Sequence, residues 1–202
     1  MLDTLVNERE GLLVREEPLD RAPLPIPAGE LALWVVLATV AMLFAGFTSA
    51  YLVRRSAGDW VPIYSPAILW VNTGVILLSS VGLELAKSAW RAGRFEQGRN
   101  WIVASAALGA AFVAGQVLAW KQLAASGIFL PTSPHSSFFY MLTGVHTFHV
   151  LGGLAALLFV VQRAWNSQSA PYLVAPVKHI ATYWHFVAGV WLFLYVLLFI
   201  WR

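Results

Sequence analysis

Two histidines lie three residues apart in an apolar stretch of this 202-residue chain. Residues 136–153 read SSFFYMLTGVHTFHVLGG and contain His146 and His149. In an α-helix this spacing places both imidazoles on nearly one face, and Thr143 lies on the same face one turn earlier. Imidazoles inside a membrane can bind a metal, transfer protons or form hydrogen bonds between helices. Which of these applies depends on the helices that position them.

The composition indicates an integral membrane protein. Hydrophobic residues make up 59% of the chain and charged residues 11%, whereas soluble domains have about 25% charged residues. The ten tryptophans and six tyrosines suit a protein with two membrane–water interfaces. The sequence has no cysteine, which excludes disulfides, thiolate metal sites and covalently attached c-type haem. The first apolar run begins near Glu30 rather than after a short basic region, so no cleavable signal peptide is expected.

Five apolar segments are each long enough to cross a bilayer, because about 20 helical residues span about 30 Å of hydrocarbon. We expect an all-α integral membrane protein with five transmembrane helices. A polar, proline-rich arm over residues 1–29 precedes a membrane domain over residues 30–202, and it is either a disordered tail or a segment that docks on a partner subunit. The predicted spans are residues 31–53, 66–86, 101–123, 137–162 and 179–201.

The distribution of basic residues predicts the orientation, because cytoplasmic connections carry an excess of Lys and Arg. Nine of the 13 basic residues fall in the arm and in the second and fourth connections: Arg9, Arg15, Arg21, Lys87, Arg91, Arg94, Arg99, Arg163 and Lys178. The N-terminus is therefore expected in the cytoplasm and the C-terminus outside.

Few polar groups fall inside the predicted spans. Glu84 is the one carboxylate among them, and Lys87 lies one helical turn away, so we expect an interfacial ion pair, with proton handling as the alternative. Asn72 and Gln116 are expected to form hydrogen bonds between helices. An independent transporter is disfavoured, because proton or ion transport needs a series of buried ionisable groups across the bilayer.

A depth count relates a further histidine to the opening stretch. His149 lies about 18 Å into the fourth span from one side, and His185 lies about 10 Å into the fifth span from the other. In a core of about 30 Å these levels nearly coincide. We therefore predict that His149 and His185 approach each other. Thr143, His146, His149 and His185 would then form a polar seam that fastens the fourth and fifth spans.

Metal binding and catalysis are not expected of this seam. Three histidines suit zinc, copper or iron, but the same layer offers no carboxylate or fourth histidine, since His135 falls in a loop and His179 at the membrane edge. Neutral, hydrogen-bonded imidazoles are the favoured interpretation, and proton handling is the alternative. The sequence predicts no catalytic residue.

The membrane region resembles a known family along nearly its whole length. The runs TGVHTFHVLGG and YWHFVAGVWLFLY, in the fourth and fifth spans, resemble subunit III of haem–copper terminal oxidases. AGFTSAY, NTGVILLSS and LGAAFVAGQ are similar to the corresponding parts of the first three spans. The number of spans suits the five-span bacterial form, and the residues before Glu30 are not covered.

The resemblance implies a subunit of cytochrome c oxidase, a complex that reduces oxygen to water and pumps protons. Haem and copper are then expected on partner subunits and not on this chain. The chain would pack on subunit I in a complex that also contains subunit II, bind phospholipids, and help to sustain proton uptake. The bacterial inner membrane is the expected location.

Three departures from the family pattern concern carboxylates. Thr39, Val40 and Ala41 stand where the family commonly has a buried glutamate in the first span, and Ala119 and Ala188 stand where it has a glutamate and an aspartate. These losses leave open a divergent branch, the subunit III-like accessory protein of nitric oxide reductase.

Overall fold

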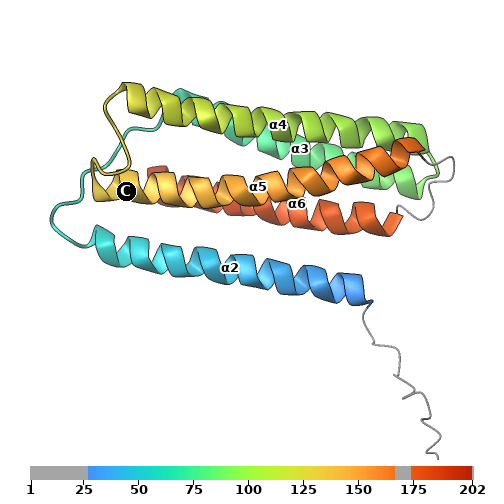
Figure 1. Cartoon of the computed structure of the whole chain (residues 1–202), viewed down its shortest axis with the longest axis horizontal. Helices are drawn as coiled ribbons and strands as arrows, with labels where there is room; N and C mark the ends of the chain where they lie inside the picture. Colours follow the sequence, from blue (N-terminus) through green and yellow to red (C-terminus); the bar gives the residue numbers. More distant parts are fainter. Residues whose placement is uncertain (1–26, 167–173, 202) are drawn as a thin grey trace, which may run out of the picture. The chain divides into compact units, whose positions relative to one another are not determined.

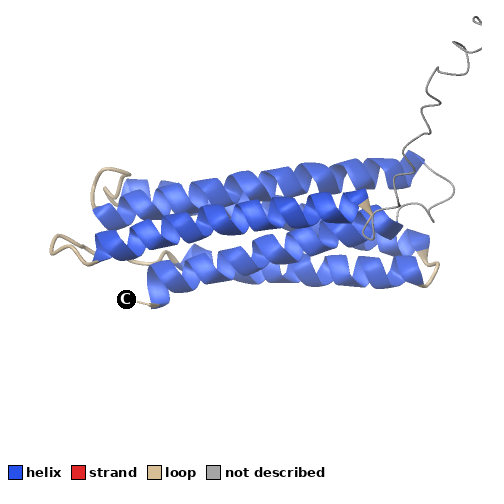
Figure 2. Cartoon of the chain, turned by 90° about the horizontal axis from the view of Figure 1, so that it is seen from below, coloured by secondary structure: helices blue, strands red, loops and turns tan. Residues whose placement is uncertain are grey.

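A computed structural model describes residues 27–166 and 174–201 of the chain. Over these residues the chain is helical without strands (Figure 2), and five helices are long and apolar enough to cross a membrane. For this part of the chain, the prediction of an all-helical fold with five helices able to span a membrane is confirmed. The helices are α2 (Ala28–Arg55), α3 (Ala67–Arg91), α4 (Phe95–Ala125), α5 (Pro134–Asn166) and α6 (Val174–Tyr195), which continues into a π-helical turn, η2 (Val196–Ile200). Most of the predicted arm lies outside the described residues.

Glycine and proline set the limits of the helices. Gly93 and Gly127 lie two residues past the ends of α3 and α4 and have φ of 72° and 77°, a left-handed conformation that favours glycine. The next backbone N–H in each case donates to a carbonyl five residues back, which closes the helix end. Pro66 precedes α3 and Pro134 begins α5, where a missing N–H is tolerated.

The helices extend beyond the predicted spans. α4 begins at Phe95 and α5 reaches Asn166, so both continue past the apolar segment into polar sequence. Hydropathy detects only the part that lies in hydrocarbon, whereas Glu, Gln and Arg in these extensions are good helix formers in water.

Four helices form a closed bundle within the compact unit Leu33–Arg202. α3 packs against α4, α4 against α5, α5 against α6, and α6 against α3, and Figure 1 shows these four helices running side by side. From Leu33 onward, α2 contributes a single buried stripe at helical spacing: Leu37, Val40, Phe44 and Tyr51. Its other faces remain exposed.

Hydrogen bonds join α2 to the end of the last helix. The Tyr51 hydroxyl donates to the carbonyl of Leu197 at 3.3 Å, and Arg55 Nη1 donates to the carbonyl of Trp201 at 2.7 Å. A π-helical turn displaces carbonyls from the regular ladder, so these two side chains provide donors for the backbone of the final turns.

Close helix contacts in the core depend on small residues opposite large rings. A Cβ at Gly109 of α4 would lie 2.7 Å from the indole of Trp184, and one at Gly153 of α5 would lie 2.9 Å from the ring of Tyr183. Packing of this kind stabilises membrane helices, because lipid removes most of the hydrophobic drive for their association.

Candidate functional site

His146 is at the centre of the bundle. Its side chain is fully buried, and its ring centroid lies 6.3 Å from that of Phe44 in α2, 5.9 Å from Phe112 in α4 and 5.4 Å from Trp191 in α6. Neither ring nitrogen has a hydrogen-bond partner among the described residues. A charged imidazole surrounded by three apolar rings would lack both water and a counter-ion, so His146 is neutral.

His149 joins α5 to α6 through its backbone and not through its ring. Its Nδ1–H donates to the carbonyl of Val145 in the same helix at 2.8 Å, and its ring lies 5.8 Å from that of Phe44. The hydroxyl of Tyr183 in α6 donates to the backbone carbonyl of His149 at 3.0 Å.

His185 belongs to a polar cluster between α6 and α3. Ser80 bonds to its Nδ1, and its Nε2–H donates to Glu84 Oε2 at 3.3 Å. Lys87 Nζ lies 2.6 Å from the same carboxylate oxygen. The side chains of Glu84, His185 and Lys87 are 52%, 39% and 20% exposed, so the cluster opens to the outside of the bundle.

The predicted pairing of His149 with His185 is wrong. α6 contacts both α3 and α5, and the imidazole of His185 faces α3, where it bonds to Ser80 and Glu84. α3 and α5 both run antiparallel to α6, so matching depth does not choose between them. The seam predicted between the fourth and fifth spans therefore does not include His185.

Thr143 and Asn72 connect other pairs of helices. Thr143 Oγ1 accepts a hydrogen bond from Trp120 Nε1 of α4 at 3.0 Å, which corrects the expectation that Thr143 faces the fifth span. Asn72 Nδ2 of α3 donates to the carbonyl of Phe112 in α4 at 3.0 Å. Gln116 differs from the prediction, because neither its amide nitrogen nor its oxygen has a hydrogen-bond partner in the described part of the chain.

Two buried tryptophans provide hydrogen bonds that the sequence analysis missed. Trp184 Nε1 donates to Ser79 Oγ at 3.1 Å, and Trp191 Nε1 donates to Thr73 Oγ1 at 3.0 Å, so both tie α6 to α3. The sequence could have indicated these bonds, because a buried indole N–H needs an acceptor. The second predicted span carries the hydroxyl side chains of Ser79 and Thr73 at about the depth of the two tryptophans.

His135 lies in the first turn of α5 and is buried, although a loop position was expected. Its Nδ1 accepts a hydrogen bond from the backbone N–H of Ile63 at 3.0 Å, and its ring stacks on Trp60 at 5.0 Å. The imidazole thereby fastens the connection between α2 and α3 to α5.

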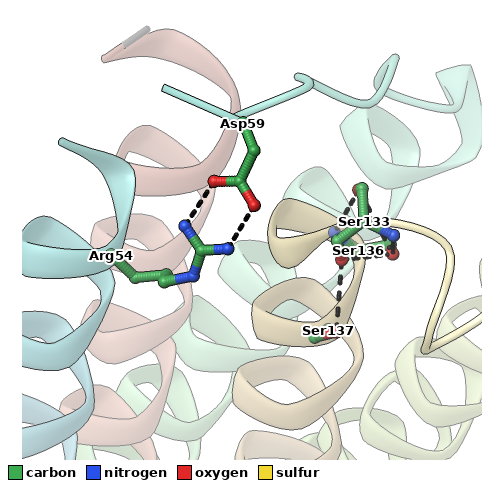
Figure 3. Close-up of polar contacts among 5 residues, drawn as sticks. All are labelled: Arg54, Asp59, Ser133, Ser136 and Ser137. Atoms are coloured by element: carbon green, nitrogen blue, oxygen red, sulfur yellow. Dashed lines mark hydrogen bonds and ion pairs between the residues drawn. The ribbon is translucent and has the colours of Figure 1, made fainter. Parts of the chain in front are cut away.

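The same end of the bundle carries an exposed ion pair. Arg54 forms two hydrogen bonds of 2.5 Å to the carboxylate of Asp59, as Figure 3 shows. These bonds hold the pKa of the Asp59 carboxyl below its usual value. Nearby, Ser133 and Ser136 exchange backbone-to-hydroxyl hydrogen bonds at 2.9 and 3.1 Å and cap the start of α5.

A family comparison matches nearly all of the described chain. The model of the family "cytochrome c oxidase subunit III" covers residues 31–202, which include most of α2 and all later helices. The chain belongs to the cytochrome c oxidase subunit III family.

Individual relatives carry the same family name. The probable cytochrome c oxidase subunit 3 of Mycobacterium tuberculosis is 32% identical over 170 residues, 82% of this chain and 84% of that protein. The cytochrome c oxidase subunit 3 of Thermostichus vulcanus is 32% identical over 179 residues, 84% of this chain and 86% of that protein. The Synechocystis protein of the same name is 33% identical over 178 residues, 82% and 73% of the two chains.

The histidines of this subunit III chain are dispersed over the bundle. The ring of His146 contacts rings of α2, α4 and α6. The ring of His149 contacts α2, and that of His185 bonds to α3. Throughout residues 27–166 and 174–201, no three His, Cys, Asp or Glu side chains are grouped so that they could bind a metal. The imidazoles of His149 and His185 form hydrogen bonds, and that of His146 packs against aromatic rings.

Alanine, valine and threonine occupy the positions where the resemblance to subunit III implies carboxylates. Ala119 and Ala188 are 0% and 3% exposed, and Val40 is buried as well. Thr39 turns its hydroxyl to the carbonyl of Val35 at 2.9 Å. A carboxylate at either alanine would be enclosed in the core and would need a new partner.

Proposed function

We propose that this chain is the non-redox subunit III of a respiratory terminal oxidase, in which it stabilises subunit I and supports the proton-coupled reduction of oxygen to water. The observation that carries the proposal is the family match over residues 31–202. Haem and copper would reside in the partner subunits, and this chain would hold no active site of its own.

Exposed apolar faces support contacts with lipid and with the partner subunits I and II. Met42, Val53 and Phe148 expose 76%, 73% and 73% of their surface on the outside of the helices. Water would penalise such side chains, whereas acyl chains and the apolar helices of a partner would accommodate them.

Two hollows beside α2 support phospholipid binding. One, of about 350 Å³, is lined by Val36 of α2, Gly153 of α5 and Tyr183 of α6 and is almost wholly apolar. The other, of about 990 Å³, is lined by Arg54 and Ser137 among other residues. An acyl chain would occupy the apolar groove. A lipid phosphate at the second hollow would compete with the Asp59 carboxylate for Arg54, because both terminal nitrogens of Arg54 bond to Asp59.

The proposed location is the bacterial inner membrane, with the N-terminus in the cytoplasm and the C-terminus outside. The short connection between α3 and α4 carries basic residues at both flanks, as cytoplasmic connections do. In this orientation the Glu84–Lys87–His185 cluster opens near the cytoplasmic side, from which an oxidase takes up protons, and proton handling by Glu84 would occur there.

Purification in mild detergent through an affinity tag on this chain tests the proposed function. Co-purification of a subunit I with two haems and copper, identified by mass spectrometry and by its reduced-minus-oxidised spectrum, is the expected outcome. A partner with haem and non-haem iron would instead identify an accessory protein of nitric oxide reductase. A lone oligomer would contradict the proposal and favour an independent transporter.

A further inference from the structure

Two polar side chains of the core are completely buried without a hydrogen-bond partner among the residues described. They are Gln116 of α4 and His146 of α5, both 0% exposed. The atoms concerned are the amide nitrogen and oxygen of Gln116 and both ring nitrogens of His146. Native proteins rarely leave such atoms unpaired, because each has lost its hydrogen bonds to solvent.

The register of α4 and α5 brings these two side chains to the same level. Trp120 of α4 donates to Thr143 of α5 at 3.0 Å, and the ring of Phe112 of α4 lies 5.9 Å from that of His146. Gln116 lies one helical turn from both Trp120 and Phe112, so it falls between these two contacts. His146 lies one turn beyond Thr143 on the same face.

The partner that these atoms require is small and neutral. A neighbouring subunit cannot reach them, because this chain alone already covers both side chains. Neither Gln116 nor His146 contacts a carboxylate in the part of the chain described, so a cation would lack a counter-charge. A neutral amide and a neutral imidazole together present both donors and acceptors, which match the two donors and two acceptors of water.

We propose that Gln116 and His146 hold a bound water between α4 and α5. Buried waters in proteins typically make about three hydrogen bonds to polar groups that would otherwise be unpaired. Here the water accepts from one side chain and donates to the other. It thereby links α4 to α5 one turn away from the Trp120–Thr143 hydrogen bond.

Radiolytic labelling of the complex purified through this chain tests the proposal directly. Pulsed X-rays generate hydroxyl radicals from bound as well as bulk water, and mass spectrometry then measures the oxidation of each residue relative to the unfolded chain. His146 is expected to be oxidised although it has no exposed surface, whereas Phe139, which is equally buried, stays unmodified. In the Gln116→Leu variant, labelling of His146 should fall to the level of Phe139.

Labelling of His146 as low as that of Phe139 in the unaltered protein would overturn the proposal, and this comparison needs no variant to fold.

Thermal unfolding adds a second measurement. Gln116→Leu and His146→Leu should each lower Tm by about 2–4 °C. The double variant should lose less than the sum, because it removes both groups that need the water. Additive losses would contradict a shared water.

Discussion

The imidazole of His185 forms hydrogen bonds to α3, whereas that of His149 bonds to a carbonyl of its own helix. Ser80, which bonds to His185, is buried, so its hydroxyl depends on this imidazole for an acceptor. The ring of His149 contacts Phe44, and its hydrogen bond goes to Val145 of its own helix, so no polar group of another helix depends on it. The two histidines therefore differ in their contribution to helix association.

Replacing each histidine by phenylalanine tests this difference. His185→Phe should lower the free energy of unfolding by about 1–2 kcal/mol, because it leaves the Ser80 hydroxyl unpaired. His149→Phe should cost less than about 1 kcal/mol, since the ring contact survives. Thermal unfolding in detergent measures both, and the haem spectrum of the co-purified oxidase should remain unchanged. Equal losses from the two variants would show that this assignment is wrong.

The exposed pair of Arg54 and Asp59 predicts a pH dependence. Its hydrogen bonds lower the pKa of the Asp59 carboxyl in the folded state, so the pair stabilises the fold above the unfolded pKa. This contribution is lost as pH falls through the lowered folded pKa. Between about pH 5 and about pH 3, the Tm of the unaltered protein should therefore fall more steeply than that of Asp59→Asn.

Glu96→Gln is the matched control for this pH series. It removes a carboxylate in the first turn of α4 but leaves the Arg54–Asp59 pair in place. Because the pair is retained, the Tm of Glu96→Gln should still fall more steeply than that of Asp59→Asn. A flattened profile in Glu96→Gln but not in Asp59→Asn would contradict the assignment of this acid sensitivity to Asp59.

At the scale of helices, the contact between α4 and α6 depends on a missing side chain. Trp184 fits against Gly109, and its indole is held by the hydrogen bond to Ser79 and is 1% exposed. A new Cβ at Gly109 would meet two ring atoms at 2.7 Å. The indole cannot retreat without losing that hydrogen bond.

Gly109→Ala should therefore destabilise the protein by about 1–3 kcal/mol through overpacking. Gly74→Ala is the matched control in α3, since a Cβ there meets no atom of the described residues within 4 Å. It should be neutral or stabilise by up to about 1 kcal/mol, because alanine favours a helix over glycine. Thermal unfolding of the two variants checks this expected difference in sign, and similar effects would contradict the packing argument.

Hydropathy predicted the five helices because each span is a continuous apolar segment, a property of the chain alone. The partners of the polar residues depend on helix rotation and on which helices are neighbours. His185 shows the difference: its depth was read from the sequence, but depth matched it equally to α3 and to α5. Trp184 and Trp191 were missed for the same reason, since their acceptors lie in α3, far away in sequence.

For the molecule as a whole, the absence of cysteine from the sequence makes the orientation directly testable. Ala57→Cys places a thiol in the connection between α2 and α3, and Ala92→Cys places one between α3 and α4, where both residues are exposed. A membrane-impermeant maleimide applied to spheroplasts should label the first variant only. Labelling of Ala92→Cys alone would reverse the proposed orientation, and permeabilised cells, in which both should react, provide the control.

Among the helices described, α2 is synthesised first and η2 last. The bonds from Tyr51 to Leu197 and from Arg55 to Trp201 can therefore form only after all the intervening helices have entered the membrane. Until then, α2 lacks the contacts that tie it to the end of the chain. A polypeptide terminated before Val196 would never acquire them, and α2 would keep its ring contacts with α5, through Phe44 against His146 and His149, without this link between the two ends of the membrane domain.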